Sequence, residues 1–411
     1  MTVDGSRRAL VGYLALTGAS VYAGAGAMRG LRIPPILDPR AAPRTAHHSD
    51  SNFSASAEGA FFQQVDGDAL TWRAFEPEPI LKIKGTFHLR LDNIHPGATL
   101  EVSGPGRVSG ERIENLRRTV TGDTGANTLT LRWRFPQQTT YRFSVIGDTG
   151  GGRELAWTLE RSRQLGMHFM LHLGDIYYQS GDYQRAVTAL NHSPLPVYAT
   201  IGNHDLRNGP DWFLADQFIA HIGPTNSTFK LGGIQFVNLD TAADTIPWSG
   251  GGRGRLLRAL PALTDNPGIR DYVVFTHRPI TDPRAVTDRP NDHSIENFGE
   301  DGWLYRQLVS RGVRSILNGH IHKTIEFEDR QLRTYIAGEG LAHLDLVGGK
   351  QVARILVGEV AAGELVAYHW EPMNMPFEFH CSQRLRQDMA EYGDHFSEAL
   401  AKLNIHCASS I

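Results

Sequence analysis

The chain has 411 residues, of which 41% are apolar and 21% are charged, and its formal net charge at pH 7 is −3. A chain of this length is long enough for two or three domains, and its apolar content allows a sizeable core. Because the chain has no net positive charge with which to hold phosphates of a nucleic acid, we expect no nucleic-acid partner.

The N-terminal 30 residues have the pattern of an export signal. Residues 9–28 carry no charge, follow Arg7 and Arg8, and precede Arg29. A run of about 20 such residues predicts either a cleaved signal peptide or a membrane anchor over 1–30, with a buried core helix as the alternative. Both favoured interpretations place the rest of the chain in the periplasm, the cell envelope or the extracellular space.

Two regions that differ in amino-acid composition follow. Residues 31–58 are rich in proline and then in small polar residues, which predicts a linker. Residues 59–138 contain short alternating runs, separated by turns such as Pro96-Gly97, and predict a small antiparallel β domain. Shielding, positioning and guiding the substrate all stay open as its role. The expected strands are 80–83, 86–91, 99–102 and 128–133.

Residues 139–375 are predicted to form a second, larger domain of α/β type. Expected strands 143–146, 169–173 and 197–201 alternate with expected helices 153–165 and 184–190, which predicts a parallel sheet covered by helices. Two later hairpins, 228–239 and 352–370, predict either two sheets or one mixed sheet rather than a pure Rossmann fold.

Residues 376–411 are predicted to be a C-terminal helical tail. Apolar residues recur there at spacings of three and four, as in an amphipathic helix. Cys381 and Cys407 lie near its two ends, and an exported protein permits a disulfide between them. Because about 20 helical residues span roughly 30 Å, we expect free thiols, or a bridge only as a strained exception.

Five predicted strands end in residues that commonly bind metals. Each apolar run is followed by Asp, Asn or His, and in most cases a glycine allows close approach of the backbone. A single such site has an ordinary explanation as a turn or a core histidine, but five in the same structural position predict a shared site at the sheet edge. The sequences are Gly147-Asp148-Thr149-Gly150, Gly174-Asp175-Ile176-Tyr177-Tyr178, Gly202-Asn203-His204-Asp205, Thr276-His277-Arg278-Pro279 and Asn318-Gly319-His320-Ile321-His322.

This ordered set resembles the calcineurin-like metallophosphoesterase superfamily, and its GDxG and GDxxY forms resemble the purple acid phosphatases. The resemblance covers about residues 141–370 and implies a four-layer α/β/β/α sandwich with a two-metal site at the strand ends. It implies that one metal is held by Asp148, Asp175, Tyr178 and His322. The second would be held by Asp175, Asn203, His277 and His320, so that Asp175 bridges the pair.

The first motif bears on the identity of the metals. Many members of the superfamily, including bacterial cyclic-nucleotide phosphodiesterases, have a ligand histidine where this chain has Gly150. Tyr178 would replace it, or Tyr177 if the register slips by one residue. Hard anionic donors favour Fe(III) at the first position and leave the second for Zn, Fe or Mn.

The resemblance also implies a chemistry. A hydroxide that bridges two such metals would attack phosphorus in line. His204 would stabilise the phosphoryl oxygens or protonate the leaving oxygen. Asp205 would orient His204, with a simple turn carboxylate as the alternative, and His293 is either a further site histidine or a loop histidine.

Two further residues have simple explanations. His172 is expected to be a packed core histidine. Arg153, at a predicted helix start, would meet phosphate or face solvent.

We therefore expect an exported or membrane-tethered hydrolase of small-molecule phosphate monoesters. A phosphodiesterase acting on cyclic nucleotides or lipid headgroups is the alternative, because the same metal core serves both reactions. A non-catalytic scaffold on the same fold is the third hypothesis.

Overall fold

The computed structural model describes residues 45–49, 53–178, 181–206, 212–242, 251–284, 293–295, 301–341, 346–347, 350–351, 353–375 and 401. The predicted export segment 1–30 lies outside this part of the chain, as does the predicted tail 376–411 with both cysteines, apart from residue 401. Within the described residues, no helix is both long and apolar enough to cross a membrane.

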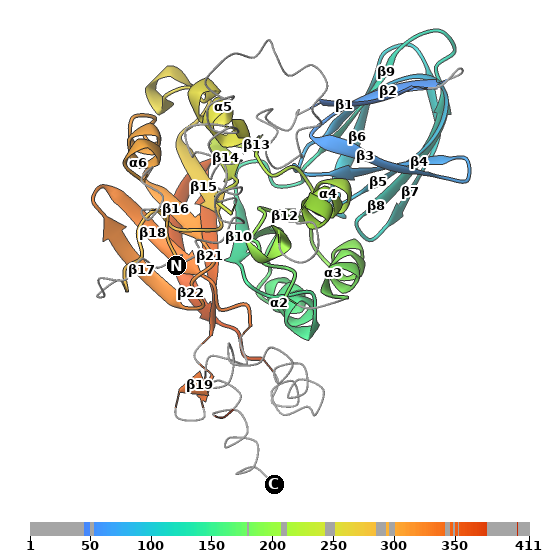
Figure 1. The fold of residues 1–411 in the computed structure, drawn as a ribbon. Helices are drawn as coiled ribbons and strands as arrows, with labels where there is room; N and C mark the ends of the chain where they lie inside the picture. Colours follow the sequence, from blue (N-terminus) through green and yellow to red (C-terminus); the bar gives the residue numbers. More distant parts are fainter. Residues whose placement is uncertain are drawn as a thin grey trace, which may run out of the picture. The chain divides into compact units, whose positions relative to one another are not determined.

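The first nine strands form one hydrogen-bonded sheet that is organised around the long strand β5 (Figure 1). The first half of β5 pairs with β2 and β9, and its second half pairs with β4 and β8. Gly85, with φ 101°, lies where the partners change, a backbone conformation that favours glycine. The strands are β1 (Thr45–Ser49), β2 (Phe53–Glu58), β3 (Ala60–Asp66), β4 (Ala69–Ala74), β5 (Ile80–Asp92), β6 (Thr99–Ser103), β7 (Arg107–Glu114), β8 (Arg117–Asp123) and β9 (Leu129–Arg134).

Two sequence predictions for this region need correction. Residues 45–58, predicted to belong to the linker, form β1 and β2 apart from the undescribed residues 50–52. The prediction failed because the inward positions of β2 are Phe53, Ala55 and Ala57, and alanine gives a weak apolar signal. The runs 80–83 and 86–91 form a single strand, and the β4–β5 pair is parallel although the other pairs in this sheet are antiparallel.

The region after residue 140 contains two mixed sheets, one of the alternatives predicted. The five-stranded sheet has the order β12-β11-β10-β21-β22, in which β10, β11 and β12 are parallel. The six-stranded sheet has the order β13-β14-β15-β16-β18-β17, with β14, β15, β16 and β18 parallel. The bounds are β10 (Tyr141–Ile146), β11 (Phe169–His172), β12 (Val197–Ala199), β13 (Ser227–Leu231), β14 (Ile234–Leu239), β15 (Asp271–Thr276), β16 (Ser315–Asn318), β17 (Thr324–Asp329), β18 (Leu332–Ala337), β19 (Leu346–Val347), β20 (Lys350–Gln351), β21 (Arg354–Ala361) and β22 (Glu364–Pro372).

Three apolar clusters show how these sheets pack. One joins the two sheets through facing residues such as Phe169 and Phe236. The second packs the five-stranded sheet against α2, α3 and α4, and the third packs the six-stranded sheet against α5 and α6 (Figure 1). The fold is therefore mixed α/β, as predicted. The helices are α2 (Arg153–Gln164), α3 (Asp182–Asn191), α4 (Trp212–His221), α5 (Gly251–Ala259) and α6 (Asp301–Val309), with short 3₁₀ turns at His204–Leu206 and Leu263–Asp265.

Candidate metal centre

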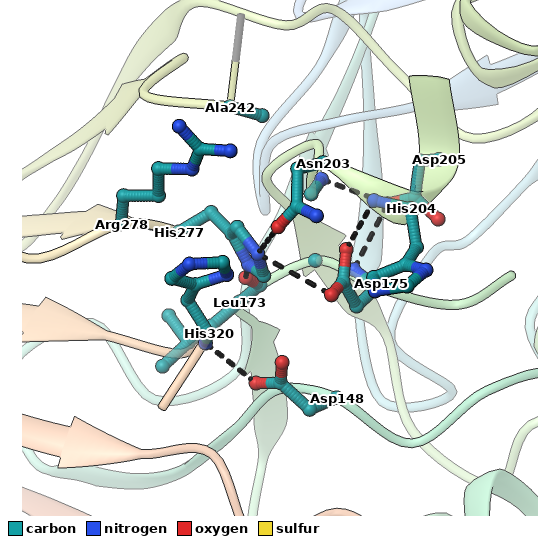
Figure 2. A network of polar contacts seen from close by, with 12 residues as sticks. Asp148, Leu173, Asp175, Asn203, His204, Asp205, Ala242, His277, Arg278 and His320 are labelled. Atoms are coloured by element: carbon teal, nitrogen blue, oxygen red, sulfur yellow. Dashed lines mark hydrogen bonds and ion pairs between the residues drawn. The ribbon is translucent and has the colours of Figure 1, made fainter. Parts of the chain in front are cut away.

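Polar side chains from both sheets meet at the carboxyl ends of their parallel strands (Figure 2). The loops after β10, β11 and β12 come from the five-stranded sheet, and the loops after β15 and β16 come from the six-stranded sheet. The sequence-predicted residues that meet here are Asp148, Asp175, Tyr178, Asn203, His204, Asp205, His277, His293, His320 and His322.

The backbone at this site is held in an uncommon conformation. Asp148, Asp175 and His320 have φ values of 63°, 59° and 68°, in the left-handed region that non-glycine residues rarely adopt. Such strain persists only where surrounding contacts enforce it, and it concentrates at functional sites. A Cβ added to Gly202 would lie 2.1 Å from Asp175 Oδ1, so glycine is needed there for the two loops to approach.

His277 is oriented toward the oxygens of two neighbouring side chains. Its Nδ1 lies 2.7 Å from the carbonyl oxygen of Leu173, so this nitrogen carries a hydrogen and donates it. Its Nε2 lies 2.9 Å from Asn203 Oδ1 and 3.4 Å from Asp175 Oδ2. In a neutral ring the Nε2 lone pair would face two oxygen acceptors, and a cation between these atoms, or a proton on Nε2, removes that conflict.

Tyr178, rather than Tyr177, belongs to the site. Its phenolic oxygen lies 3.4 Å from Asp148 Oδ1, 3.4 Å from Asp175 Oδ2 and 3.1 Å from His322 Nε2. Tyr177 packs in the apolar cluster with the helices. Tyr178 therefore faces the candidate metal centre and Tyr177 does not, and the role of Tyr178 as a metal ligand stays a prediction.

The buried groups Asp175, His277 and His320 could together hold a metal ion. Each offers a ligand atom, and these atoms lie within 4.8 Å of one another. The His277 and His320 rings are 4.9 Å apart, and the His320 backbone N–H donates to Asp148 Oδ2 at 2.8 Å. Buried carboxylates, imidazoles and a phenol make a donor set that fits metal cations.

The charge balance of the buried carboxyls also fits a cation. Burial alone would raise the pKa of Asp175, but the nearby His277, His204 and His320 imidazoles lower it below its usual range. Burial raises the pKa of Asp148, which the neighbouring His322 and His277 only partly oppose. A cation close to both groups would favour their ionised forms.

The same electrostatics act on Tyr178 and His277. Burial raises the pKa of the Tyr178 phenol well above its usual value, and the Asp175 and Asp148 carboxylates raise it further. A phenolate at this position therefore requires an added positive charge. Burial lowers the pKa of His277, but Asp175 and Asp148 outweigh it and bring the pKa to about 9.

His204 and Asp205 have different surroundings. The His204 backbone N–H donates to Asp175 Oδ1 at 2.8 Å, and its half-buried ring lies 4.5 Å from the Tyr178 ring. The Asp205 carboxylate accepts backbone N–H groups of Asp175, Ile176 and Gly202 at 3.0, 2.9 and 2.8 Å. Through these hydrogen bonds Asp205 connects the loops that follow β11 and β12. Burial raises the pKa of the Asp205 carboxyl to about 7.

The remaining predicted residues take their places around the centre. The His293 ring lies 5.3 Å from the His320 ring. His172 is fully buried, with Nε2 2.9 Å from Thr149 Oγ1, as expected of a core histidine. Arg153 is the exposed first residue of α2.

Two residues that support the site, Asp182 and Thr241, were not predicted from the sequence. Asp182 accepts the backbone N–H of Tyr178 at 2.9 Å, and Thr241 Oγ1 accepts the backbone N–H groups of His277 and Arg278 at 3.1 and 2.7 Å. Thr241 follows β14, so a sixth strand end with polar residues was present in the sequence as a signal. Asp182 was missed because the predicted start of α3 was placed two residues too late.

A family model, "Calcineurin-like phosphoesterase", matches residues 117–324, which include every predicted metal ligand. The chain belongs to this family. The assignment confirms the resemblance found in the sequence. This calcineurin-like phosphoesterase also contains a candidate metal site.

Known proteins show more distant similarity to this calcineurin-like phosphoesterase. The mouse (Mus musculus) serine/threonine-protein phosphatase CPPED1 is 24% identical over 149 residues, which are 35% of this chain and 47% of the mouse protein, so the match spans about half of that relative. A purple acid phosphatase, PPD1, from yellow lupin (Lupinus luteus) seeds has 12% identity and a TM-score of 0.46, with 82% of this chain and 73% of that chain covered. A dimetal phosphatase from Danio rerio has 11% identity and a TM-score of 0.37, covering 57% and 97%.

Proposed function

We propose that this chain is a two-metal hydrolase of small-molecule phosphate monoesters. The observation that carries the proposal is the convergence of two carboxylates, a phenol, an amide and three imidazoles at the ends of strands from both sheets. Figure 2 shows the part of this set that is formed by Asp148, Asp175, Asn203, His277 and His320. The mouse relative is a serine/threonine-protein phosphatase, which supports monoesters because phosphoserine and phosphothreonine are monoesters.

We assign the ligands of the first metal to Asp148, Asp175, Tyr178 and His322. The Tyr178 oxygen lies within 3.4 Å of both carboxylates and 3.1 Å from His322 Nε2, so these four groups face one another. Three of the four donors are anionic oxygens once the phenol ionises, and such donors suit Fe(III).

The second metal is assigned to Asp175, Asn203, His277 and His320. Two imidazoles and an amide oxygen suit Zn, divalent Fe or Mn. When bound, the two ions would supply Lewis-acid activation of water and of the phosphoryl group. Asp175 would contact both ions, because its Oδ2 lies 3.4 Å from the Tyr178 phenolic oxygen and 3.4 Å from His277 Nε2.

His204 acts on the substrate rather than on a metal in this proposal. Its backbone is fastened to Asp175 while its half-buried ring keeps some exposure to solvent. From there it would hold phosphoryl oxygens or give a proton to the departing oxygen. Asp205 would help it indirectly by fixing the loops, and His293 would help to place His320.

We also propose that the hydrolase works outside the cytoplasm. The basic start and the uncharged run 9–28 support export or a membrane tether. N-terminal sequencing of the protein recovered from its producing cells separates the two: a start after residue 20 supports cleavage, and an intact Met1 in the membrane fraction supports a tether.

The test of the hydrolase uses the full chain loaded with iron plus zinc or manganese. Hydrolysis of an aryl phosphomonoester is measured beside the matching diester, and we expect the monoester to react at least about 10-fold faster. Asp175→Asn should lose at least about 100-fold in kcat, a barrier increase of about 2.7 kcal/mol. Asp66→Asn, which alters an exposed carboxylate in the β domain, is the matched control and should retain activity.

Two results would contradict this proposal in different ways. A faster diester reaction would favour a phosphodiesterase. Metal-loaded protein with no Asp175-dependent turnover of either ester would favour the scaffold hypothesis.

A further inference from the structure

The short strand β12 carries part of the candidate metal centre and lies at the edge of its sheet. Within the described residues β12 pairs only with β11, and the chain continues from it to Asn203 and His204. Pro196 O and the Thr200 N–H bond toward β11. The N–H and C=O groups of Val197 therefore point away from β11, where a further strand would pair.

Asn93, in the loop after β5, takes the place of that further strand. Its Oδ1 accepts the Val197 N–H at 3.0 Å, and its Nδ2 donates to the Val197 oxygen at 2.9 Å. A side-chain amide has one acceptor and a pair of N–H donors, so it can satisfy both groups of one strand residue. The second Nδ2 hydrogen donates to the Ala74 oxygen at 2.8 Å, which ties β12 to the end of β4.

The conformation of Asn93 is specialised for this contact. The residue is 2% exposed and has φ 68°, in the left-handed region that asparagine tolerates better than most residues. A second asparagine, Asn238 of β14, donates to the Ala199 oxygen at 3.1 Å. The outward edge of β12 is thus held from two sides, by the β domain at Val197 and by the six-stranded sheet at Ala199.

Other contacts of the β domain reach the same region but do not touch β12. Asn115, with φ 52°, donates to the Ser193 oxygen at 2.8 Å, and Arg73 donates to Asn191 Oδ1 at 2.8 Å. Both of these partners precede the strand. Asn115 is therefore a suitable comparison for Asn93, because both residues are asparagines of the β domain with a left-handed backbone.

We propose that Asn93 is a positioning residue through which the β domain sets the position of Asn203 and His204. Holding Val197 fixes the start of a strand only three residues long, and Asn203 follows six residues later in the chain. A shift of β12 would move Asn203 Oδ1 relative to His277 Nε2, which now lie 2.9 Å apart. The role of the β domain is therefore to complete the edge of the sheet that carries the metal centre. The inference rests on the proposed metal assignment but not on catalysis.

The test compares Asn93→Gly with Asn115→Gly. Glycine keeps the left-handed backbone available at both positions and removes only the side-chain amide. Metal-stripped full-length proteins are titrated with Zn²⁺ and with Mn²⁺, and hydrogen exchange of residues 197–206 is followed under conditions in which each protein is folded.

We expect Asn93→Gly to weaken one metal-binding step by about 10-fold or more, as losses of outer-shell support do, and to speed exchange in residues 197–206. Asn115→Gly should match the wild-type chain in both measurements. If Asn93→Gly does not fold, Asn93→Asp gives the same comparison, since it keeps the acceptor for the Val197 N–H but loses both donors.

Two outcomes would overturn the inference. One is wild-type metal affinity and exchange in the folded Asn93 variant, and the other is an equal loss in Asn115→Gly, which would indicate general weakening of the domain contact. Neither readout requires turnover. A wild-type chain that binds metal but cleaves no ester would contradict the proposed function while leaving the Asn93 comparison valid.

Discussion

The phenolic oxygen of Tyr178 lies 3.1 Å from Nε2 of His322, and the two residues are separated by 144 positions in the sequence. This contact joins the loop after β11 in one sheet to the loop after β16 in the other. The proposed first metal position therefore depends on the correct packing of both sheets. Each of the two residues, in contrast, can be recognised from the local sequence that follows its own strand.

Tyr178→Phe should weaken metal binding at the proposed first position and leave the fold intact. The change removes one oxygen ligand but keeps the buried ring, so its packing loss is small. We expect at least about a 10-fold loss of affinity at one metal position and little change at the other, measured by titration of the metal-stripped chain. Tyr177→Phe is the control, because Tyr177 packs in the apolar cluster. Equal effects of the two changes would contradict the assignment of Tyr178 as a ligand.

Gly202→Ala should disrupt the proposed metal centre, in which Asp175 is assigned to both metals. The added Cβ would lie 2.1 Å from Asp175 Oδ1 and 2.2 Å from the Asp175 backbone nitrogen, so the carboxylate or the loop must move. We expect hydrolysis to fall by at least about 100-fold, about 2.7 kcal/mol in the barrier, with loss of at least one bound metal per chain.

Gly268→Ala is the matched control, since a Cβ added there would meet no described residue within 4 Å apart from its two chain neighbours. It should change the free energy of unfolding by no more than about 0.5 kcal/mol and keep both metals. A Gly202→Ala protein with normal metal content would show that the two loops can separate without cost.

Asp205→Asn should loosen the loops even though the side chain keeps its size. The carboxylate accepts three backbone N–H groups with two oxygens, whereas an amide has one oxygen and would place an NH₂ group against an N–H donor. We expect the free energy of unfolding to fall by about 1–3 kcal/mol in urea titrations. Asp265→Asn, on the exposed 3₁₀ turn, is the control. An unchanged unfolding free energy in Asp205→Asn would contradict this bracing role.

Residues that meet at the candidate metal centre could be predicted from the sequence because each lies within a few residues of the end of an apolar strand. Asp148, Asp175, His277 and His320 all occupy that position, and the strands themselves were found within a few residues. Local patterns were sufficient to predict these residues because the carboxyl ends of the parallel strands of both sheets meet at one site.

Contacts between distant segments could not be predicted in the same way. Asn93 and Val197 are 104 residues apart, and a single asparagine after a strand is an ordinary turn residue in the sequence. Residues 54–57 were predicted as linker because alternating serine and alanine carry little apolar signal, although pairing with β5 makes them a strand. Both features depend on partners that a local pattern does not contain.

Lowering the pH should destabilise the contact between His95, in the loop after β5, and His168, which precedes β11. Their rings stack with centroids 6.2 Å apart. Burial lowers the pKa of His95 from 6.5 to about 4, with further contributions from His168 and Arg118, and burial also lowers the pKa of His168. Between about pH 6.5 and pH 4 the unfolded chain therefore binds protons at His95 that the folded chain does not, so stability falls as the pH is lowered through this range.

His95→Asn removes the titrating ring while its side-chain oxygen can still accept the Gly97 N–H that His95 Nδ1 accepts at 3.0 Å. The urea midpoint of the wild-type chain should fall between about pH 7 and about pH 5, and the fall should be smaller in His95→Asn. The measurement is made on metal-stripped protein at both pH values, so that protonation of the metal ligands does not alter metal occupancy between them. An equal fall in the two proteins would show that other groups control acid stability, and a midpoint that rises on acidification would reverse the expected sign.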